Sequence, residues 1–164
     1  MSLFSPDLYH TSVLAIDLEA LSARGVRYLL MDLDNTLLPR DGSGIAPEVQ
    51  AWVSALPDHG FTACLVSNNW HGHVQGVAAD IGLPIAAKAL KPLPHAFRTG
   101  LARLNAAPAE TAVVGDQLFT DVLGGNLLGM TTILVRPLSA SDLPHTLLLR
   151  HLERRLLAGR EPLA

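Results

Sequence analysis

Short apolar runs alternate with amphipathic and polar stretches along most of the chain. The clearest run, Val26 to Leu30, ends in Met31 and two nearby carboxylates, and it lacks the polar–apolar alternation of a half-exposed strand. Runs of this kind are typical of strands that are buried on both faces of a parallel sheet. We therefore expect strands at residues 26–32, 61–66, 111–114 and 131–135, and a weaker one at 84–89.

Apolar residues between these runs recur at helical spacing. Pro47 opens the clearest example, in which apolar side chains stand three and four positions apart from Val49 to Leu56. This spacing is that of an amphipathic helix with one face on a core. The same spacing, or the residues that commonly bound helices, predicts further helices at 17–23, 74–81, 97–104, 120–128 and 141–158.

The alternation of strands and helices indicates an α/β fold. We expect a Rossmann-like, doubly wound, mainly parallel sheet of about five strands with helices on both faces. A chain of 164 residues suits one domain, 1–164, in which residues 1–25 form an N-terminal extension that is irregular over residues 1–15. Ligands of such sheets bind beyond the carboxyl ends of the strands, so polar residues at those ends are the candidates for a site.

Composition narrows the class of protein. Hydrophobic residues make up 49% and charged residues 16% of the chain, which argues against disorder, and the net charge of -3 gives no bulk signal for nucleic-acid binding. The single cysteine, Cys64, excludes a disulfide framework and fits a reducing compartment. No apolar stretch is long enough to cross a bilayer and no signal peptide is evident, so we expect a cytoplasmic protein.

Polar residues stand where the predicted strands end. These residues are Asp32, Asp34, Ser67, Asn68, Lys91 and Asp116. Two carboxylates at the end of a buried strand are costly unless a cation compensates them. A turn or helix cap built from Asp34 and Asn35 is the alternative for that pair, but it does not account for the other polar residues at the same sheet edge.

The residue types at these strand ends suit phosphoryl chemistry. Asp32, Asp34 and Asp116 offer the oxygen ligands that Mg2+ prefers. Lys91 and the Ser67 hydroxyl, with turn amides, suit a phosphate group. One carboxylate can attack phosphorus to form an aspartyl-phosphate, while a second protonates the leaving oxygen and later activates water.

The order of these residues resembles that of the haloacid dehalogenase (HAD) superfamily. Its motifs match Asp32-Leu33-Asp34-Asn35-Thr36, then Ser67, then Lys91, then Gly115-Asp116 with Asp121. The chain is also similar to the YqeG subgroup of type IIIA HAD phosphatases, which is related to the mitochondrial phosphatidylglycerophosphate phosphatases. That similarity runs from Phe4-Ser5-Pro6 to Glu153-Arg154-Arg155 and rests on Ser67-Asn68-Asn69, Lys91-Pro92, Gly115-Asp116-Gln117-x-x-Thr120-Asp121 and Gly124-Gly125-Asn126.

The resemblance implies a Mg2+-dependent phosphomonoester hydrolase that acts through an aspartyl-phosphate. Asp32 would be the nucleophile and a metal ligand, Asp34 the general acid and base with its carbonyl at the metal, and Asp116 a further metal ligand. The resemblance also assigns phosphate binding to Ser67, the Asn68 amide and Lys91, and support to Thr36 and Asp121. Asp121 has a second reading, as the cap of the helix that it begins. Leu90 departs from the pattern, in which a basic residue precedes Lys-Pro, and this puts one substrate contact in doubt.

Segments 37–60 and 70–90 leave no room for the cap domain of many HAD enzymes. An uncapped site suits a bulky substrate, because no lid closes over a small one. The resemblance implies phosphatidylglycerophosphate, and the alternatives are another bulky phosphate, a soluble sugar phosphate, a nucleotide or a nucleic-acid end. Two alternatives belong to other classes: a phospho-acceptor signalling module and a catalytically idle binding protein. Asp34 argues against the signalling module, because an acid at this position speeds release of the phosphate that such a module must keep.

The predicted helix 141–158 is basic and amphipathic. One arc carries Leu148, Leu149, Leu152 and Leu156, and the opposite arc carries Arg150, His151, Arg154 and Arg155. Such a helix can lie on an anionic membrane, here the inner face, or its leucines can pack on the sheet and leave its arginines in water. Trp70, His71 and His73 follow the second motif and are candidates either for substrate contact or for a solvated helical turn.

Overall fold

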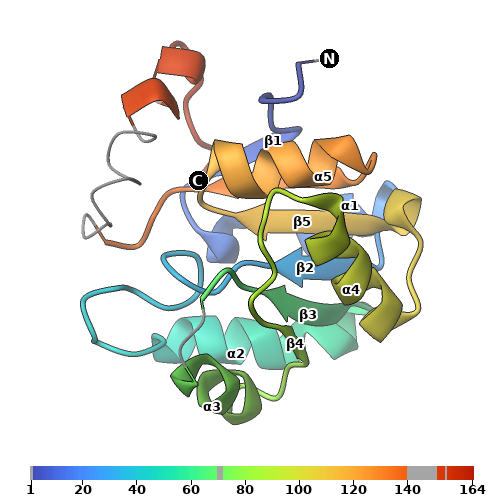
Figure 1. The fold of residues 1–164 in the computed structure, drawn as a ribbon, viewed down its shortest axis with the longest axis vertical. Helices are drawn as coiled ribbons and strands as arrows, with labels where there is room; N and C mark the ends of the chain where they lie inside the picture. Colours follow the sequence, from blue (N-terminus) through green and yellow to red (C-terminus); the bar gives the residue numbers. More distant parts are fainter. Residues whose placement is uncertain (1, 70–71, 140–150, 154) are drawn as a thin grey trace.

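The computed structural model describes residues 2–69, 72–139, 151–153 and 155–164. Within these residues, six parallel strands form one sheet in the order β1-β6-β5-β2-β3-β4 (Figure 1). The strands are β1 (Leu8–His10), β2 (Tyr28–Met31), β3 (Thr62–Val66), β4 (Ile85–Ala86), β5 (Thr111–Gly115) and β6 (Thr131–Val135). The expected α/β class with a mainly parallel sheet is therefore confirmed, with six strands in place of about five.

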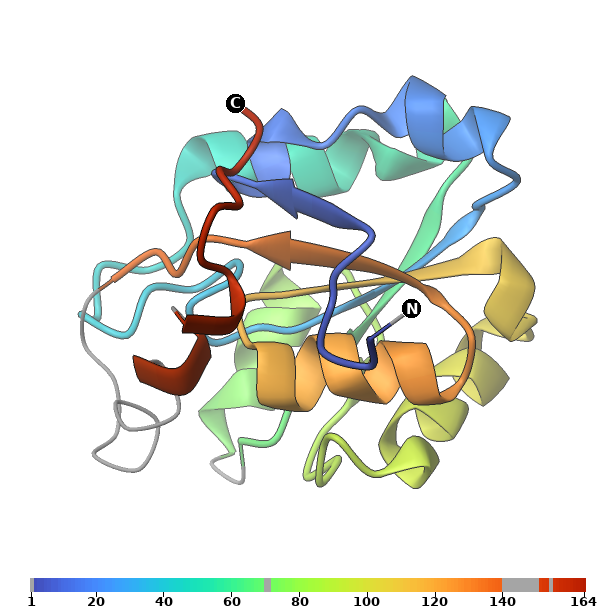
Figure 2. The same ribbon diagram turned by 90° about the horizontal axis from the view of Figure 1, so that it is seen from above.

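Helices lie on both faces of the sheet. The α-helices are α1 (Leu18–Ala23), α2 (Pro47–Ala55), α3 (His73–Asp80), α4 (Pro94–Leu104) and α5 (Leu123–Leu127). Short 3-10 turns are η1 (Val13–Ala15), η2 (Leu56–His59) and η3 (Pro108–Glu110), and a π-helical turn, η4 (Leu118–Val122), runs directly into α5. Figure 2 shows α1 and α2 on one side of the strands and α4 and α5 on the other.

The central strands are continuously apolar because both of their faces are covered. Successive side chains of a strand point to opposite faces. Leu29 and Met31 accordingly join the apolar cluster that α2 covers, and Leu30 joins the cluster that contains Phe97 of α4. Cys64 is fully buried in the second cluster, which fits a core residue.

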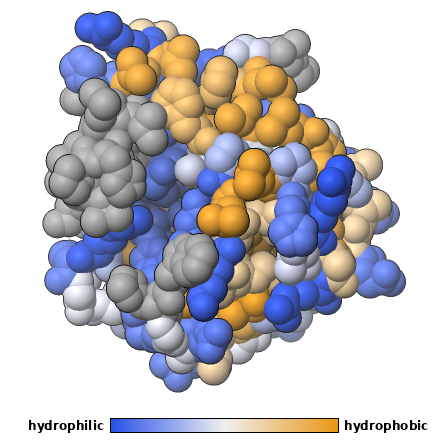
Figure 3. Space-filling view, viewed as in Figure 1, coloured by the Kyte–Doolittle hydropathy of each residue, from blue (hydrophilic) through white to orange (hydrophobic). Residues whose placement is uncertain are grey.

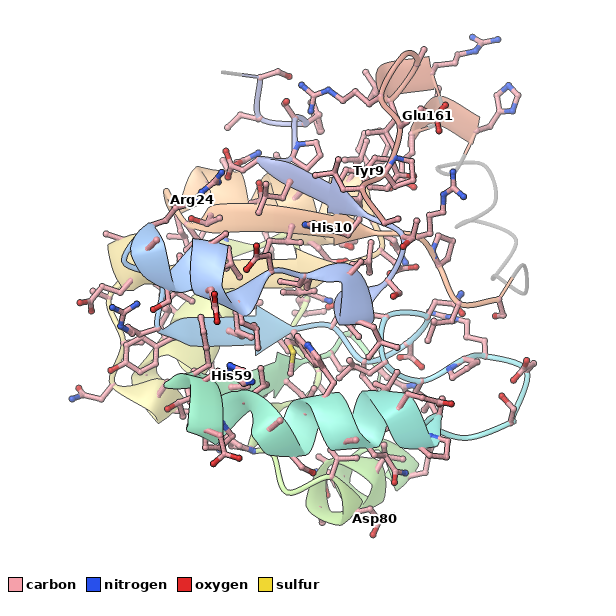
Figure 4. All side chains as sticks on the ribbon, turned by 180° about the vertical axis from the view of Figure 1, so that it is seen from behind. Tyr9, His10, Arg24, His59, Asp80 and Glu161 are labelled. Carbon is pink, nitrogen blue, oxygen red and sulfur yellow. The ribbon has the colours of Figure 1, made fainter. Side chains whose placement is uncertain are left out.

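The N-terminal region contains a strand where the sequence predicted irregular structure. β1 pairs in parallel with β6 through Leu8, Tyr9 and His10, and Figure 4 shows Tyr9 and His10 on this edge strand. The prediction for residues 1–15 was wrong because a strand of three mixed residues has no readable period. The strand β1 forms because it pairs with β6, more than a hundred positions away, and such a tertiary contact leaves no local pattern in the sequence.

Two further predicted elements differ in extent. The strand expected at 84–89 is only Ile85–Ala86, and the helix expected at 120–128 starts earlier, at the π-helical turn η4.

The predicted C-terminal helix is described only in part, since residues 140–150 and 154 lie outside the described residues. Residues 151–153 and 155–156 are helical, and a turn follows at 157–159 rather than further helix. Leu152 and Leu156 are 44% and 52% exposed, so these two do not pack on the sheet. Leu157 instead packs on the cluster of Leu118, Val122 and Leu134, which lies by β6. In the part of the chain that the structure describes, no helix has the length and apolar character needed to span a bilayer.

Candidate active site

Asp32 lies at the centre of the carboxyl edge of the sheet. β2 is flanked by β5 and β3, and Met31 is in register with the penultimate residue of each. The Asp32 N–H donates to the Val114 carbonyl at 2.8 Å, so the ladder continues one residue past β2. Ser67 and Asp116, which directly follow the two neighbouring strands, therefore lie on either side of Asp32.

A tight turn follows Asp32 and carries Asp34. The Leu33 carbonyl accepts the N–H groups of Thr36 at 3.3 Å and Leu38 at 2.9 Å, and the Asn35 N–H donates to the Leu38 carbonyl at 2.7 Å. Asn35 has a φ of 61°, a left-handed conformation that asparagine tolerates better than most residues. Asn35 and Thr36 are both buried, so the turn is held by its own backbone bonds and by packing.

Asn69 links the second motif to Asp34. Its Nδ2 donates to Asp34 Oδ2 at 3.2 Å, and its backbone N–H donates to Ser67 Oγ at 3.0 Å. Ser67 is fully buried and accepts this bond, so its own hydroxyl hydrogen remains to be donated. The sequence pointed to Asn69 only as a member of a motif, and the structure shows that it orients the candidate acid.

Lys91 bridges two carboxylates inside the protein. Its Nζ lies 2.7 Å from Asp32 Oδ1 and 2.6 Å from Asp121 Oδ1, and all three side chains are nearly excluded from solvent. Burial on its own lowers the Lys91 pKa, but the charges of Asp121 and Asp32 outweigh it and hold that pKa above its ordinary value. Lys91 is therefore a fixed positive charge against the candidate nucleophile.

Asn68 holds the backbone that carries Lys91. Its Oδ1 accepts the Lys91 N–H at 2.6 Å, and its Nδ2 donates to the Lys91 carbonyl at 3.1 Å. The sequence assigned the Asn68 backbone amide to phosphate, and the structure adds a role for the side chain. The amide clamps the peptide on both sides of the lysine and so sets the direction of its ammonium group.

Three buried carboxylates could hold a metal ion. Asp32, Asp116 and Asp121 each offer an oxygen, and these oxygens lie within 4.8 Å of one another. Asp32 and Asp116 belong to the predicted set, and the third carboxylate of the cluster is Asp121. Asp34 was predicted to reach the metal through its backbone carbonyl, and its side chain contacts Asn69. Burial raises the pKa of Asp121 to about 6 in spite of the opposing charge of Lys91. The cluster therefore has an excess of negative charge that a cation would relieve.

Gly115 leaves space for Asp121. A Cβ at this position would overlap the Asp121 carboxyl group and would lie 2.5 Å from Asp121 Cβ. Asp121 Oδ2 also accepts the Gln117 N–H at 3.2 Å, which closes the turn after β5. The glycine of the fourth motif is thus explained by the close approach of the residue that pairs with Lys91.

Glu153 is a buried residue whose role the sequence did not reveal. Its Oε1 accepts the N–H groups of Leu118 at 2.7 Å and Phe119 at 3.4 Å, at the start of η4. It is 4% exposed although it belongs to the C-terminal helical segment. A carboxylate at the first turn of a helix satisfies its unpaired N–H groups, so Glu153 stabilises the turn on which Asp121 lies. The one feature of the sequence that could have indicated this role is that Glu153 is an acidic residue in a segment otherwise rich in leucine and arginine.

The candidates for substrate contact beyond the second motif are only partly described. His73 begins α3 and is exposed. Trp70 and His71 lie outside the described residues.

Comparisons agree with the class of protein that this fold and site define, a HAD-like hydrolase. A model of that family, described as HAD-hydrolase-like, matches residues 89–139. Two solved structures show the same fold. One is a HAD phosphatase from Thermococcus onnurineus, with a TM-score of 0.52 and 22% identity, and the match covers 71% of this chain and 59% of that one. The other is the cobalt-bound deoxy-D-mannose-octulosonate 8-phosphate phosphatase of Haemophilus influenzae, with a TM-score of 0.55 and 14% identity, and the match covers 82% of this chain and 89% of that one.

Similarity to curated proteins narrows the family. The chain is 37% identical over 156 residues to the probable phosphatase YqeG of Bacillus subtilis, across 95% of this chain and 91% of that protein. It is 32% identical over 158 residues to the chloroplastic phosphatidylglycerophosphate phosphatase 1 of Chlamydomonas reinhardtii, across 87% of this chain and 54% of that protein. The chain therefore belongs to the YqeG family of HAD phosphatases, and it is a phosphatase.

Proposed function

We propose that the chain is a Mg2+-dependent phosphomonoesterase in which Asp32 is the nucleophile and phosphatidylglycerophosphate is the substrate. The observation that carries the catalytic part is the position of Asp32 at the central strand end, 2.7 Å from the buried ammonium group of Lys91. A carboxylate that is ion-paired in this way is held in one orientation, as a nucleophile must be. Lys91 can then neutralise the negative charge of an arriving phosphate.

The donor set fits Mg2+. All three members of the cluster are carboxylates, and hard cations of this kind prefer oxygen ligands. Three carboxylates against one ammonium group leave two negative charges uncompensated, which a divalent ion would balance. A bound Mg2+ would supply charge neutralisation of the phosphoryl oxygens.

The residues of the chain account for both halves of the reaction. In the first half, an Asp32 oxygen forms a bond to phosphorus while the bond to the leaving oxygen breaks, and Asp34 gives that oxygen its proton. In the second half, Asp34 takes a proton from water as the water oxygen attacks the aspartyl-phosphate, and Asp32 is released. The bond from Asn69 keeps Asp34 in one orientation for both proton transfers. The hydroxyl of Ser67 is free to donate to the phosphoryl group.

Three observations support a lipid phosphate. Relatives of this chain include phosphatidylglycerophosphate phosphatases. Between β2 and β4 the described residues hold α2, η2, β3 and α3 with their connections, and no segment among them is long enough to form a cap over the carboxyl edge. A cavity of about 330 Å³ lies beside Asp116, and its lining includes the apolar side chains of Leu134, Val135 and Leu157. We propose in consequence that the protein acts in the cytoplasm, peripheral to the inner face of the membrane.

A turnover screen tests this function. Purified protein is offered phosphatidylglycerophosphate in vesicles, sugar phosphates, nucleotides and nucleic-acid ends, each with Mg2+ and with a chelator. We expect the highest kcat/KM on the lipid, with activity lost in chelator and restored by Mg2+. Asp32→Asn should abolish turnover, whereas Asp58→Asn, a matched change at an exposed carboxylate of η2, should not.

Other outcomes separate the rival functions. A preference for a soluble phosphate would contradict the lipid assignment and leave the phosphatase intact. A phosphoryl group that stays on Asp32 without turnover would indicate a signalling module. Asp32→Asn with a tenth or more of wild-type activity would exclude covalent catalysis at this residue.

A further inference from the structure

The turn that carries Lys91 exposes a leucine on each side of the lysine. The Leu93 N–H donates to the Leu90 carbonyl at 3.0 Å and closes the turn. Lys91 points inward to Asp32 and Asp121, whereas Leu90 and Leu93 are 52% and 56% exposed. The same four residues, 90–93, therefore place an ammonium group inside the site and two large apolar side chains in water on the outside of the turn. We call these four residues the docking turn.

Packing within the protein does not account for Leu90. Its φ is 59°, in the left-handed region that a leucine rarely adopts. A single exposed leucine is ordinary on a protein surface. A leucine that is both exposed and held in this conformation gains little from folding, and such a combination points to a role in binding. The Asn68 clamp on Lys91 keeps the turn in this shape.

The segment of the chain that contains the docking turn carries charged side chains of one sign. Residues 81–109 contain no Asp or Glu, although the chain as a whole carries a net charge of -3. The exposed basic side chains next to the turn are Lys88, His95 and Arg98. In Figure 3 a small hydrophobic area lies near the centre of the face, over the segment that leads from β4 into α4, with hydrophilic surface beside it, and a larger hydrophobic area lies over α5.

We propose that the docking turn, with Lys88, His95 and Arg98, seats the enzyme on an anionic lipid bilayer. The two leucines enter the interfacial layer, and the basic side chains contact anionic headgroups. A phosphate on a lipid headgroup then reaches Lys91 and Asp32 without leaving the membrane. This inference rests on the proposed lipid substrate, because an enzyme that acts on a soluble phosphate would need neither leucine. It also gives Leu90, which replaces the basic residue of the family pattern, a function of its own.

Vesicle sedimentation and two turnover assays test the docking surface. The variant Leu90→Asn/Leu93→Ser removes both side chains, and asparagine tolerates the left-handed conformation at position 90. The matched control is Leu3→Ser/Leu127→Asn, because these leucines are 47% and 46% exposed and belong to other segments. Leu127 ends α5, and Leu3 lies in the N-terminal segment, where Asn126 Nδ2 donates to its carbonyl. Vesicles contain equal parts of phosphatidylglycerol and phosphatidylcholine, so binding is measured without substrate.

We expect the wild type and the control to sediment with the vesicles at low salt. The docking-turn variant should show a partition coefficient at least about tenfold lower, and a similar loss in turnover of vesicle-embedded phosphatidylglycerophosphate, while turnover of a small soluble phosphate ester stays unchanged. The variant Arg98→Glu should also sediment less than the wild type, and the difference should grow as salt is lowered, because the introduced carboxylate is repelled by the anionic surface.

Three results would overturn the inference. They are a wild-type protein that does not sediment, a docking-turn variant that sediments like the control, and an equal loss of turnover on soluble and vesicle substrates. In the first two cases turnover of phosphatidylglycerophosphate dispersed in detergent would still support the proposed function. Conversely, wild-type sedimentation that depends on Leu90 and Leu93, without turnover of any phosphate, would support the docking surface and contradict the proposed function.

Discussion

Replacement of Gly115 by alanine should disable the site without unfolding the protein. The added Cβ would overlap the Asp121 carboxyl group and lie 2.5 Å from Asp121 Cβ, whereas ordinary contacts start at 3.4 Å. Asp121 must therefore move by at least about 0.9 Å, because its carboxyl atoms lie closer still to the added Cβ. Gly115 is the last residue of a central strand, whose backbone is fixed by its neighbours, and Asp121 is buried beside it. We therefore expect the Asp121 side chain to move and the strand to stay in place.

The expected loss follows from what Asp121 holds. Its Oδ1 is 2.6 Å from Lys91 Nζ, and a shift of this size breaks that contact and changes the direction of the ammonium group toward Asp32. Misplacement of a reacting group by roughly 1 Å can cost on the order of 10²-fold in rate. We expect kcat of Gly115→Ala to fall by about 30- to 100-fold, with a smaller change in KM.

Steady-state kinetics on a soluble phosphate ester at saturating Mg2+, together with thermal unfolding, measures this effect. The matched control is Gly124→Ala, whose Cβ would overlap the Phe97 ring, a collision at least as close as that at Gly115 but against an apolar side chain. Such overpacking costs about 1–3 kcal/mol of stability, so the control should melt at lower temperature but keep its kcat while folded. Gly76→Ala in α3 meets nothing within 4 Å and should raise stability by about 0.5–1 kcal/mol.

Two results would refute the reasoning. One is a folded Gly115→Ala protein that keeps more than a third of wild-type kcat, which would mean that the Asp121–Lys91 contact does not position the site. The other is an equal loss of kcat in Gly124→Ala, which would mean that any collision in this layer of the protein disturbs catalysis.

The remaining predictions concern the acid, the metal and pH. Asp34→Asn should slow single-turnover phosphorylation by about 10²–10⁴-fold for a poor leaving group and much less for a good one; equal losses would show that Asp34 is not the acid. Mg2+ at 100 times its Kd should stabilise the protein by about 2.7 kcal/mol, and Asp116→Asn should lose most of the resulting rise in melting temperature. Burial lowers the His10 pKa below 6.5, so the unfolded chain binds a proton that the folded chain refuses and stability falls as pH drops below about 6.5. His10→Gln should flatten that part of the stability–pH curve, and an unchanged slope between pH 7.5 and 5.5 would contradict the assignment.

Sequence alone determined the class of fold and the order of the site residues. The runs that became β2, β3, β5 and β6 are locally apolar, because both faces of each strand are covered. Residues that follow such strands must meet at one sheet edge, so the positions of Asp32, Ser67 and Asp116 were readable without coordinates. The match to the HAD motifs then supplied the family, which the similarity to YqeG confirmed.

Tertiary structure decided what those residues touch. Lys91 is 59 positions from Asp32 and 30 from Asp121, and only the sheet order brings the three together. The same holds for the Asn68 clamp on Lys91 and for Glu153, which caps a turn 35 residues earlier. The short strand β1 likewise exists through its pairing with β6. Local periodicity reports burial and element type, whereas side-chain contacts between distant segments depend on packing that no local pattern encodes.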